Sequence, residues 1–290
     1  MKNIILLLII IALCGQIIFA QKNEKNIKRA GILVMDNWNE AEKKPLFSAI
    51  LGGFESGKYV TSKNAVGLTE NKSFTLYGLN GANKGEVNIT KLDTPMEEIC
   101  EDYYSIETDK TAHSGVLLSS DISWNPMPRI PKALSTKDAT YQKIVRDLLI
   151  GKGLKNPKVK IDQIYRIDLE GDGKDEVIIR GTNYKDGFSS ASKAGDYSFI
   201  LVRKLVTKTV GKSKTKKEVV ENILLDGNFY PKTMEFNAPN QYNLTAFADL
   251  NGDGIMEIVL YGEYYEGSWV EAYTFSGDKP LKVLETGCGV

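Results

Sequence analysis

Short blocks of hydrophobic residues, separated by glycine and polar turns, recur along most of the chain, and this is the pattern of β-strands. The blocks Ser73–Leu79 and Glu86–Leu92 flank a glycine-rich turn and predict a hairpin. Gly31–Met35 and Ser114–Ser119 predict two more short strands. Pro45–Phe54 fits a short helix or a buried strand, because a continuous apolar run of this length does not separate the two.

One segment has helical periodicity. Hydrophobic residues between Tyr141 and Leu149 recur at spacings of three and four, which predicts one clear helix at about 138–150. Thr136 or Asp138 can cap its first turn, and the glycines after residue 150 end it. Before the helix, prolines at 126, 128 and 131 resist regular structure. We therefore expect a β-rich N-terminal domain over 21–130 and a linker with the helix over 131–157.

The region 158–290 contains an internal repeat. Each copy runs strand, acidic loop, strand, strand, strand, and the acidic loops begin at Asp168 and Asp249, a period of 249 − 168 = 81 residues. The last two strands of each copy are predicted to form a hairpin. The fold class that follows is mainly β with a minor α component, built from antiparallel β repeats.

The acidic loops read DLEGDGKDE at 168–176 and DLNGDGIME at 249–257. Both place oxygen-bearing side chains at positions 1, 3, 5 and 9 and a glycine at position 6. Such a loop can direct its side chains and the carbonyl of position 7 at one point, and calcium takes six to eight oxygen ligands. The candidate metal ligands are Asp168, Glu170, Asp172, Lys174, Glu176, Asp249, Asn251, Asp253, Ile255 and Glu257.

Two other interpretations of the loops exist. An EF-hand needs a glutamate at position 12, and here that position holds Ile179 or Leu260 within an apolar run, so these loops are not EF-hands. The loops can also be tight polar turns whose Asp and Asn side chains bond their own backbone. Two matched copies favour calcium over turns alone.

The pattern D-x-D/N-G-D-G-x-x-D/E, followed by an apolar strand, resembles the FG-GAP or VCBS type of repeat found in integrin α-chain propellers and secreted bacterial proteins. The second loop matches at every ligand position, whereas the first has Glu170 where Asp or Asn is usual. The resemblance covers 158–290 and implies calcium in a β-sheet setting, without implying a reaction. Two copies are too few to close a propeller, which takes four or more blades.

The N-terminus has the layout of a secretory signal peptide over 1–20. A short basic start precedes the apolar run Ile4–Leu13, and Ala20 stands just before the expected cleavage point. Retention as a membrane anchor and a lipid anchor on Cys14 are the alternatives. We expect an exported protein, periplasmic, cell-surface or secreted. Cys100 and Cys288 then either form a disulfide or stay unpaired.

Charge and motif content exclude several functions. With 37 basic and 37 acidic residues there is no surplus for nucleic acid. Gly52–Lys58 begins like a phosphate loop, but Tyr59 stands where Ser or Thr should hold magnesium, so we expect no nucleotide. A single histidine and no nucleophile motif make an enzyme less expected. The alternative function is a secreted metal-dependent hydrolase that uses the acidic loops.

Two features bear on partners. The basic stretch Arg203–Lys217 is expected to be a solvated hairpin tip, although it could meet an anionic sugar or lipid. Aromatic residues between Tyr261 and Tyr273 fit the core or a sugar-stacking platform. The sequence as a whole predicts an exported, calcium-binding, non-catalytic binding or scaffold protein with an unknown protein or glycan ligand.

Overall fold

The computed structural model describes residues 28–39, 44–95, 99–110, 114–185, 188–210 and 215–289. The signal-peptide segment 1–20 lies outside these ranges. The described chain is mainly antiparallel β-structure, as the hydrophobic pattern predicted, and it contains two helices, of which the pattern predicted one. None of its helices has the length and hydrophobicity needed to cross a lipid bilayer.

A seven-stranded sheet forms the N-terminal unit, in the order β3-β2-β1-β7-β4-β5-β6. Its β2 settles the ambiguity at Pro45–Phe54, which is a strand paired along β1. The hairpin β4–β5 is confirmed. A helix that the pattern did not predict, α2 (Ser62–Thr69), follows β3. The strands are β1 (Arg29–Asn39), β2 (Lys44–Glu55), β3 (Lys58–Val60), β4 (Ser73–Tyr77), β5 (Asn83–Leu92), β6 (Ile106–Thr108) and β7 (Gly115–Ser119).

The predicted helix is confirmed as α3 (Ala139–Gly151), with the Asp138 side chain accepting a 2.8 Å hydrogen bond from the Thr140 N–H at its start. A five-stranded sheet of order β12-β11-β10-β9-β8 follows it. Its strands are β8 (Lys132–Ala133), β9 (Gln163–Ile167), β10 (Glu176–Asn183), β11 (Asp196–Val210) and β12 (Thr215–Tyr230).

A four-stranded antiparallel sheet, β13-β14-β15-β16, completes the chain. It repeats the β9–β12 arrangement, since in both sheets an acidic loop joins the first two strands of a four-stranded meander. Its strands are β13 (Gln241–Ala248), β14 (Glu257–Tyr264), β15 (Gly267–Ser276) and β16 (Lys279–Gly289).

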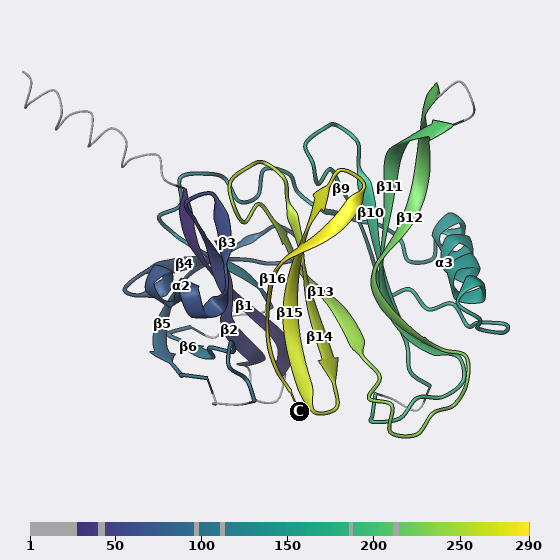
Figure 1. Cartoon of the computed structure of the whole chain (residues 1–290), viewed down its shortest axis with the longest axis horizontal. Helices are drawn as coiled ribbons and strands as arrows, with labels where there is room; N and C mark the ends of the chain where they lie inside the picture. Colours follow the sequence, from purple (N-terminus) through teal and green to yellow (C-terminus); the bar gives the residue numbers. More distant parts are fainter. Residues whose placement is uncertain are drawn as a thin grey trace, which may run out of the picture.

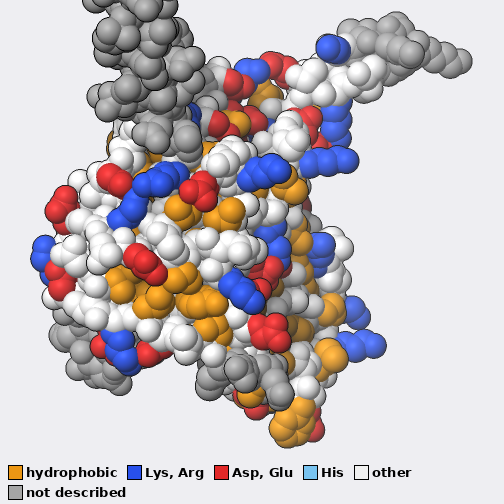
Figure 2. Space-filling view, turned by 60° about the vertical axis from the view of Figure 1, so that its left-hand side comes forward, with side chains coloured by type: hydrophobic (Ala, Val, Ile, Leu, Met, Phe, Trp, Pro, Cys, Tyr) orange, Lys and Arg blue, Asp and Glu red, His pale blue; other side chains and the backbone are white. Residues whose placement is uncertain are grey.

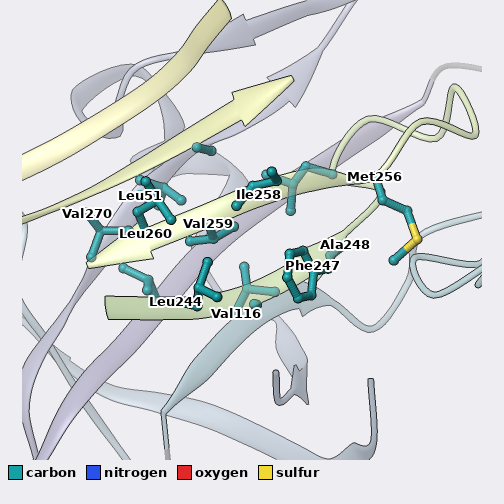
Figure 3. Close-up of a cluster of buried hydrophobic side chains, with 14 of the residues drawn as sticks. Leu51, Val116, Leu244, Phe247, Ala248, Met256, Ile258, Val259, Leu260 and Val270 are labelled. Carbon is teal, nitrogen blue, oxygen red and sulfur yellow. The ribbon is translucent and has the colours of Figure 1, made fainter. Parts of the chain in front are cut away.

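The three sheets lie side by side, with β13–β16 between the N-terminal unit and the β9–β12 sheet (Figure 1). The main hydrophobic cluster draws on all three, and its centre contains Leu51 of β2, Val116 of β7 and Ile258 of β14 (Figure 3). The outer face of each flanking sheet is covered by a helix. Leu68 of α2 packs on the N-terminal sheet, and Leu149 of α3 packs on the β9–β12 sheet.

Coverage of both faces explains the continuous apolar runs. In β1, Ile32 and Val34 face the main cluster, whereas Leu33 and Met35 face the cluster beneath α2. Side chains of a strand point alternately to opposite faces, so a strand covered on both sides needs hydrophobic residues at every position. The stretch Ile200–Val206 of β11 follows the same rule except at two charged residues, the half-buried Arg203 and Lys204, which is 4% exposed.

A disulfide joins Cys100 of the N-terminal unit to Cys288 of β16. The pairing that the sequence left open is therefore present, and it ties the last strand of the chain to the first sheet.

The phosphate-loop-like segment has a local role: Ser56 and Gly57 form the two-residue turn between β2 and β3, both with positive φ. The face of the molecule in Figure 2 has acidic and basic side chains interspersed, with hydrophobic patches between them.

Candidate metal centre

The two acidic loops follow the same backbone path. Loop one (168–176) joins β9 to β10, and loop two (249–257) joins β13 to β14. Their paired glycines match closely in φ, at 72° for Gly171 and 75° for Gly252, and at 82° for Gly173 and 89° for Gly254. Positive φ favours glycine because a Cβ atom is strained there. The glycine at position 6 therefore sets the turn, as the sequence predicted.

The aspartate at position 1 organises each loop from inside. Asp168 accepts hydrogen bonds from the N–H groups of Gly171 (2.7 Å) and Gly173 (2.9 Å). Asp249 accepts the equivalent bonds from Gly252 (2.6 Å) and Gly254 (2.9 Å). These bonds are of the kind expected for a tight polar turn. The Oδ2 atom of each aspartate accepts only one of these bonds and keeps a second lone pair, so the same side chain can also face a cation.

The glutamate at position 9 closes each loop from the first residue of the next strand. Glu176 Oε2 accepts the Leu169 N–H at 2.9 Å, and Glu257 Oε2 accepts the Leu250 N–H at 2.8 Å. Both glutamates are buried. The other carboxylate oxygen, Oε1, is where the two loops differ.

In loop one, Oε1 of Glu176 faces a lysine. Lys204 of β11 places its Nζ 3.4 Å from this oxygen and also contacts Oε2 of Glu170. Burial alone would lower the pKa of Lys204, but the two carboxylates outweigh it and the pKa is raised. Asp172 accepts the Lys174 N–H, while the Lys174 ammonium pairs with Glu218 at 2.5 Å in solvent.

In loop two, Oε1 of Glu257 is buried and has no hydrogen-bond partner among the described residues. Burial, together with the nearby charges of Asp253 and Asp249, raises the pKa of Glu257 to about 8. The hydroxyl of Tyr59, from β3, is also buried; it makes no hydrogen bond of normal geometry in the described chain, but it lies close enough to this carboxylate for Glu257 to raise the pKa of Tyr59. An unpaired buried carboxylate oxygen is costly and calls for an explanation.

The remaining positions of loop two form a small polar network. Asn251 Oδ1 accepts the Asp253 N–H at 2.9 Å, and Asp253 Oδ1 accepts the Ile255 N–H at 2.7 Å. Asp253 is exposed, Asn251 and Ile255 are half-buried, and Asp249 is buried. Loop two therefore runs from an exposed residue, Asp253, to a buried one, Glu257.

The loops also lie against each other. The Met256 N–H donates to the Leu169 carbonyl at 2.8 Å. Arg129 contacts the carbonyl oxygens of both, with Nη2 at 2.8 Å from Leu169 and 2.5 Å from Gly254. Its Nε contacts the Asp168 carbonyl. The proline-rich segment, read from sequence as a domain boundary, therefore carries a side chain that bridges the two loops.

The same segment supports loop two further. The Trp124 indole N–H donates to the Asp249 carbonyl at 2.9 Å, and the Pro126 carbonyl accepts the Asp249 N–H at 2.8 Å. The Trp124 ring covers Gly252 so closely that a Cβ there would lie 2.7 Å from its Cδ2 atom. The division into domains at 130 and 157 stays a prediction.

Sequence reasoning missed Lys204, Arg129, Trp124 and Tyr59, which approach the loops from distant parts of the chain. Lys204 was included in the stretch expected to be a solvated hairpin tip, and for this residue that expectation is wrong. A signal was present, since residues 200, 202 and 206 are hydrophobic and alternation places Lys204 on the same inward face. The other three residues have no such local signal.

The donor set of loop two fits calcium in kind. Asp249, Asp253, Glu257, the Asn251 amide and the Ile255 carbonyl offer only oxygen, which hard cations prefer. Within the described residues, no three His, Cys, Asp or Glu side chains are grouped as around a bound metal. A calcium shell here would accordingly need the amide and carbonyl oxygens as well as the carboxylates. Loop one offers Asp168, Glu170, Asp172, the Lys174 carbonyl and Glu176 in the same order.

The aromatic residues of the last sheet are found in different settings. Tyr261 is buried in the core, whereas Tyr264 and Trp269 line a groove of about 670 Å³ together with Asp102 and Thr286. A glycan-binding role for these residues stays a prediction.

Comparison of the chain with protein-family models, curated proteins and solved structures finds no match, so the resemblance to FG-GAP and VCBS repeats rests on the two loops.

Proposed function

We propose that this chain is an exported, calcium-stabilised binding or scaffold protein, and that loop two holds the calcium ion. The ion would be structural, fixing β13 to β14 and both to the N-terminal unit. The binding partner, a protein or a glycan, would meet a surface kept in shape by this ion. The proposal assigns no catalytic residue.

The observation that carries the proposal is the buried Oε1 atom of Glu257. A carboxylate oxygen without a partner in the protein interior costs free energy in the charged state. A divalent cation beside it would supply the missing opposite charge and would also engage Asp253 and Asp249, whose charges now raise the pKa of Glu257. Calcium suits the site because all the available donors are oxygen atoms.

Export is supported by two features outside the loop. The apolar run Ile4–Leu13 has the layout of a signal peptide. The Cys100–Cys288 bond fits an oxidising compartment, where disulfides persist. Extracellular fluids also supply millimolar calcium, and extracellular calcium modules typically bind with dissociation constants of roughly 10⁻⁴–10⁻³ M.

Thermal unfolding with and without calcium tests the proposal. With a dissociation constant of about 10⁻⁴ M, 10 mM calcium would stabilise the folded chain by about 2.7 kcal/mol. For a protein of this size we expect the melting temperature to rise by roughly 5–10 °C. Magnesium at the same concentration should give a smaller rise, because it demands a tighter octahedral shell.

Asp253→Ala removes an exposed ligand at the open end of loop two and should abolish most of the calcium effect. Asp147→Ala is the matched control, since this exposed carboxylate belongs to α3, outside both loops, and pairs with Lys143. The proposal fails if wild-type protein melts at the same temperature with and without 10 mM calcium. Calcium-dependent turnover of an ester or glycan that is lost in Asp253→Ala would favour a hydrolase instead.

A further inference from the structure

Lys204 brings a positive charge to the closing glutamate of loop one. Its ammonium group contacts Glu170 and lies 3.4 Å from Glu176, the two carboxylates that the sequence assigned to positions 3 and 9 of a metal shell. The side chain of Lys204 is 4% exposed and that of Glu176 is 3% exposed. A lysine is rarely buried to this degree unless it is paired with opposite charge.

The repeat shows which residue of the second sheet corresponds to Lys204. Val177 pairs with Arg203 across β10 and β11, and Ile258 pairs with Tyr273 across β14 and β15. The next position places Lys204 beside Glu176 in one sheet and Thr274 beside Glu257 in the other. The side chain of Thr274 interacts with Glu257 and lowers its pKa, but it brings no charge. The closing glutamates therefore differ in one residue opposite them on the neighbouring strand, which is charged at loop one and uncharged at loop two.

Position 3 of loop one, where the repeat pattern usually has Asp or Asn, also differs in a way that involves Lys204. Glu170 stands where loop two has Asn251, and its longer arm reaches the Lys204 ammonium. Asn251 instead accepts the Asp253 N–H at 2.9 Å within its own loop. Glu170 and Lys204 thus form a matched pair of changes, one in the loop and one in the strand across from it.

The ammonium is also held from the side of the next sheet. Lys204 Nζ lies 5.3 Å from the centre of the Phe275 ring, a distance at which a cation is attracted to an aromatic face. Loop two has Tyr59 in a comparable place, beside Glu257 and approaching from the N-terminal sheet. Each closing glutamate therefore lies near an aromatic residue from a neighbouring sheet, and only loop one has a cation of its own.

We propose that Lys204 is a built-in cation that takes the place of calcium in loop one, so that the chain binds a single calcium ion, at loop two. Loop one is then folded and charge-balanced without metal, whatever the calcium concentration. The inference rests on the proposed calcium function for its prediction at loop two, but the claim about loop one can be tested separately.

The direct experiment is a calcium titration by isothermal calorimetry with equilibrium dialysis of radioactive calcium as a second readout. Wild-type protein should bind one ion per chain. Lys204→Thr copies the residue of loop two into loop one and should raise the number to two. Lys208→Thr is the matched control, because Lys208 lies on the same strand, is half-exposed and pairs only with Glu221 among the contacts described; it should bind one ion.

Substitutions within the loops assign the ions. In wild-type protein, Asp253→Ala should abolish binding, whereas Asp172→Ala, at the equivalent position of loop one, should leave the titration unchanged. In the Lys204→Thr background, Asp172→Ala should return the number of ions from two to one. Asp172 is exposed, so this variant carries little risk to folding and still tests the inference if Lys204→Thr is unstable.

The reciprocal substitution tests whether a lysine at the corresponding position displaces calcium from loop two. Thr274→Lys should bring an ammonium group to Glu257 and lower calcium affinity at least tenfold. Thr274→Met, of similar length but uncharged, is the control for bulk and should lower the affinity less.

The outcomes separate this inference from the proposed function. Two ions bound by wild-type protein, one of them lost in Asp172→Ala, would overturn the role of Lys204 and leave the calcium function standing. No ion in wild type but one in Lys204→Thr would reject the calcium function at loop two and support the role of Lys204. An unchanged single ion in a folded Lys204→Thr variant would also overturn the inference.

Discussion

Loop one and loop two have nearly the same sequence pattern and the same backbone path, yet the charged groups around their carboxylates differ. In loop one, Lys204 lies against Glu176 and Glu170. In loop two, Oε1 of Glu257 is buried with no partner in the described chain. The comparison teaches that a loop motif fixes the order of the oxygen-bearing side chains, whereas a residue on the neighbouring strand decides which charge lies against them.

The surroundings of the two loops differ as well. Loop two belongs to the middle sheet and is supported by Trp124 and Tyr59 from the N-terminal part of the chain. Loop one belongs to an outer sheet and is exposed over residues 171–175. Arg129 is the residue that bridges them. Four predictions test these differences, beginning with the largest expected effect.

The Cys100–Cys288 bond ties the middle sheet, and not the outer one, to the N-terminal unit. It closes a loop of 188 residues, and a cross-link of that span is expected to stabilise the folded state by about 5 kcal/mol through the entropy of the unfolded chain. Reduction, or the double substitution of both cysteines by serine, should lower the denaturation midpoint accordingly. Reductant should have no effect on the double variant, and equal midpoints for oxidised and reduced wild type would contradict the prediction.

Arg129→Ala should loosen both loops together. The substitution leaves the carbonyl oxygens of Asp168, Leu169 and Gly254 without their charged donor, and hydrogen bonds to charged groups contribute about 1.5–3 kcal/mol each. Because the three bonds share one side chain, we expect a total loss of roughly 3 kcal/mol in chemical denaturation. Amide exchange should accelerate in both loops. Faster exchange in one loop only would show that Arg129 does not couple them.

Gly252→Ala should destabilise the protein more than Gly171→Ala. Both glycines have the same positive φ, so the backbone cost is shared at about 1–2 kcal/mol. The new Cβ of residue 252 would lie 2.7 Å from the rigid Trp124 ring. That of residue 171 would lie 2.9 Å from Nη1 of Arg129, at the end of a flexible side chain that can shift more easily. We expect a difference of about 1 kcal/mol in thermal unfolding. Combining each substitution with Trp124→Ala should remove the difference, and a difference that persists would rule out the ring as its cause.

Lys174→Ala should have the smallest effect. Its ammonium pairs with Glu218, but both side chains are about half exposed, and solvent and salt screen such pairs so that they contribute little. We expect a change in the denaturation midpoint close to experimental error at low salt, and none at high salt. A larger loss would mean that position 7 of loop one holds the loop through its side chain, unlike Ile255 in loop two.

Much of the secondary structure could be predicted from the sequence, because it depends on the local pattern of hydrophobic and polar residues. The helix at Ala139–Gly151 has strong periodicity and an Asp138 cap, and the strands around the loops have clear apolar runs. The helix Ser62–Thr69 was missed because it is short, contains Gly67 and is stabilised by packing on the first sheet. Pro45–Phe54 was ambiguous because a strand covered on both faces has no alternation to reveal it.

The sequence by itself determined the two loops, the order of their oxygen-bearing side chains and the glycines that turn them, because these features depend on residues a few positions apart. Only the tertiary structure decided that Lys204 meets loop one, that Thr274 and Tyr59 meet loop two, and that Arg129 and the disulfide connect distant parts. The physical reason is that charge balance in a buried site depends on every group within a few ångströms. Those groups come from strands that the chain brings together only when the sheets pack.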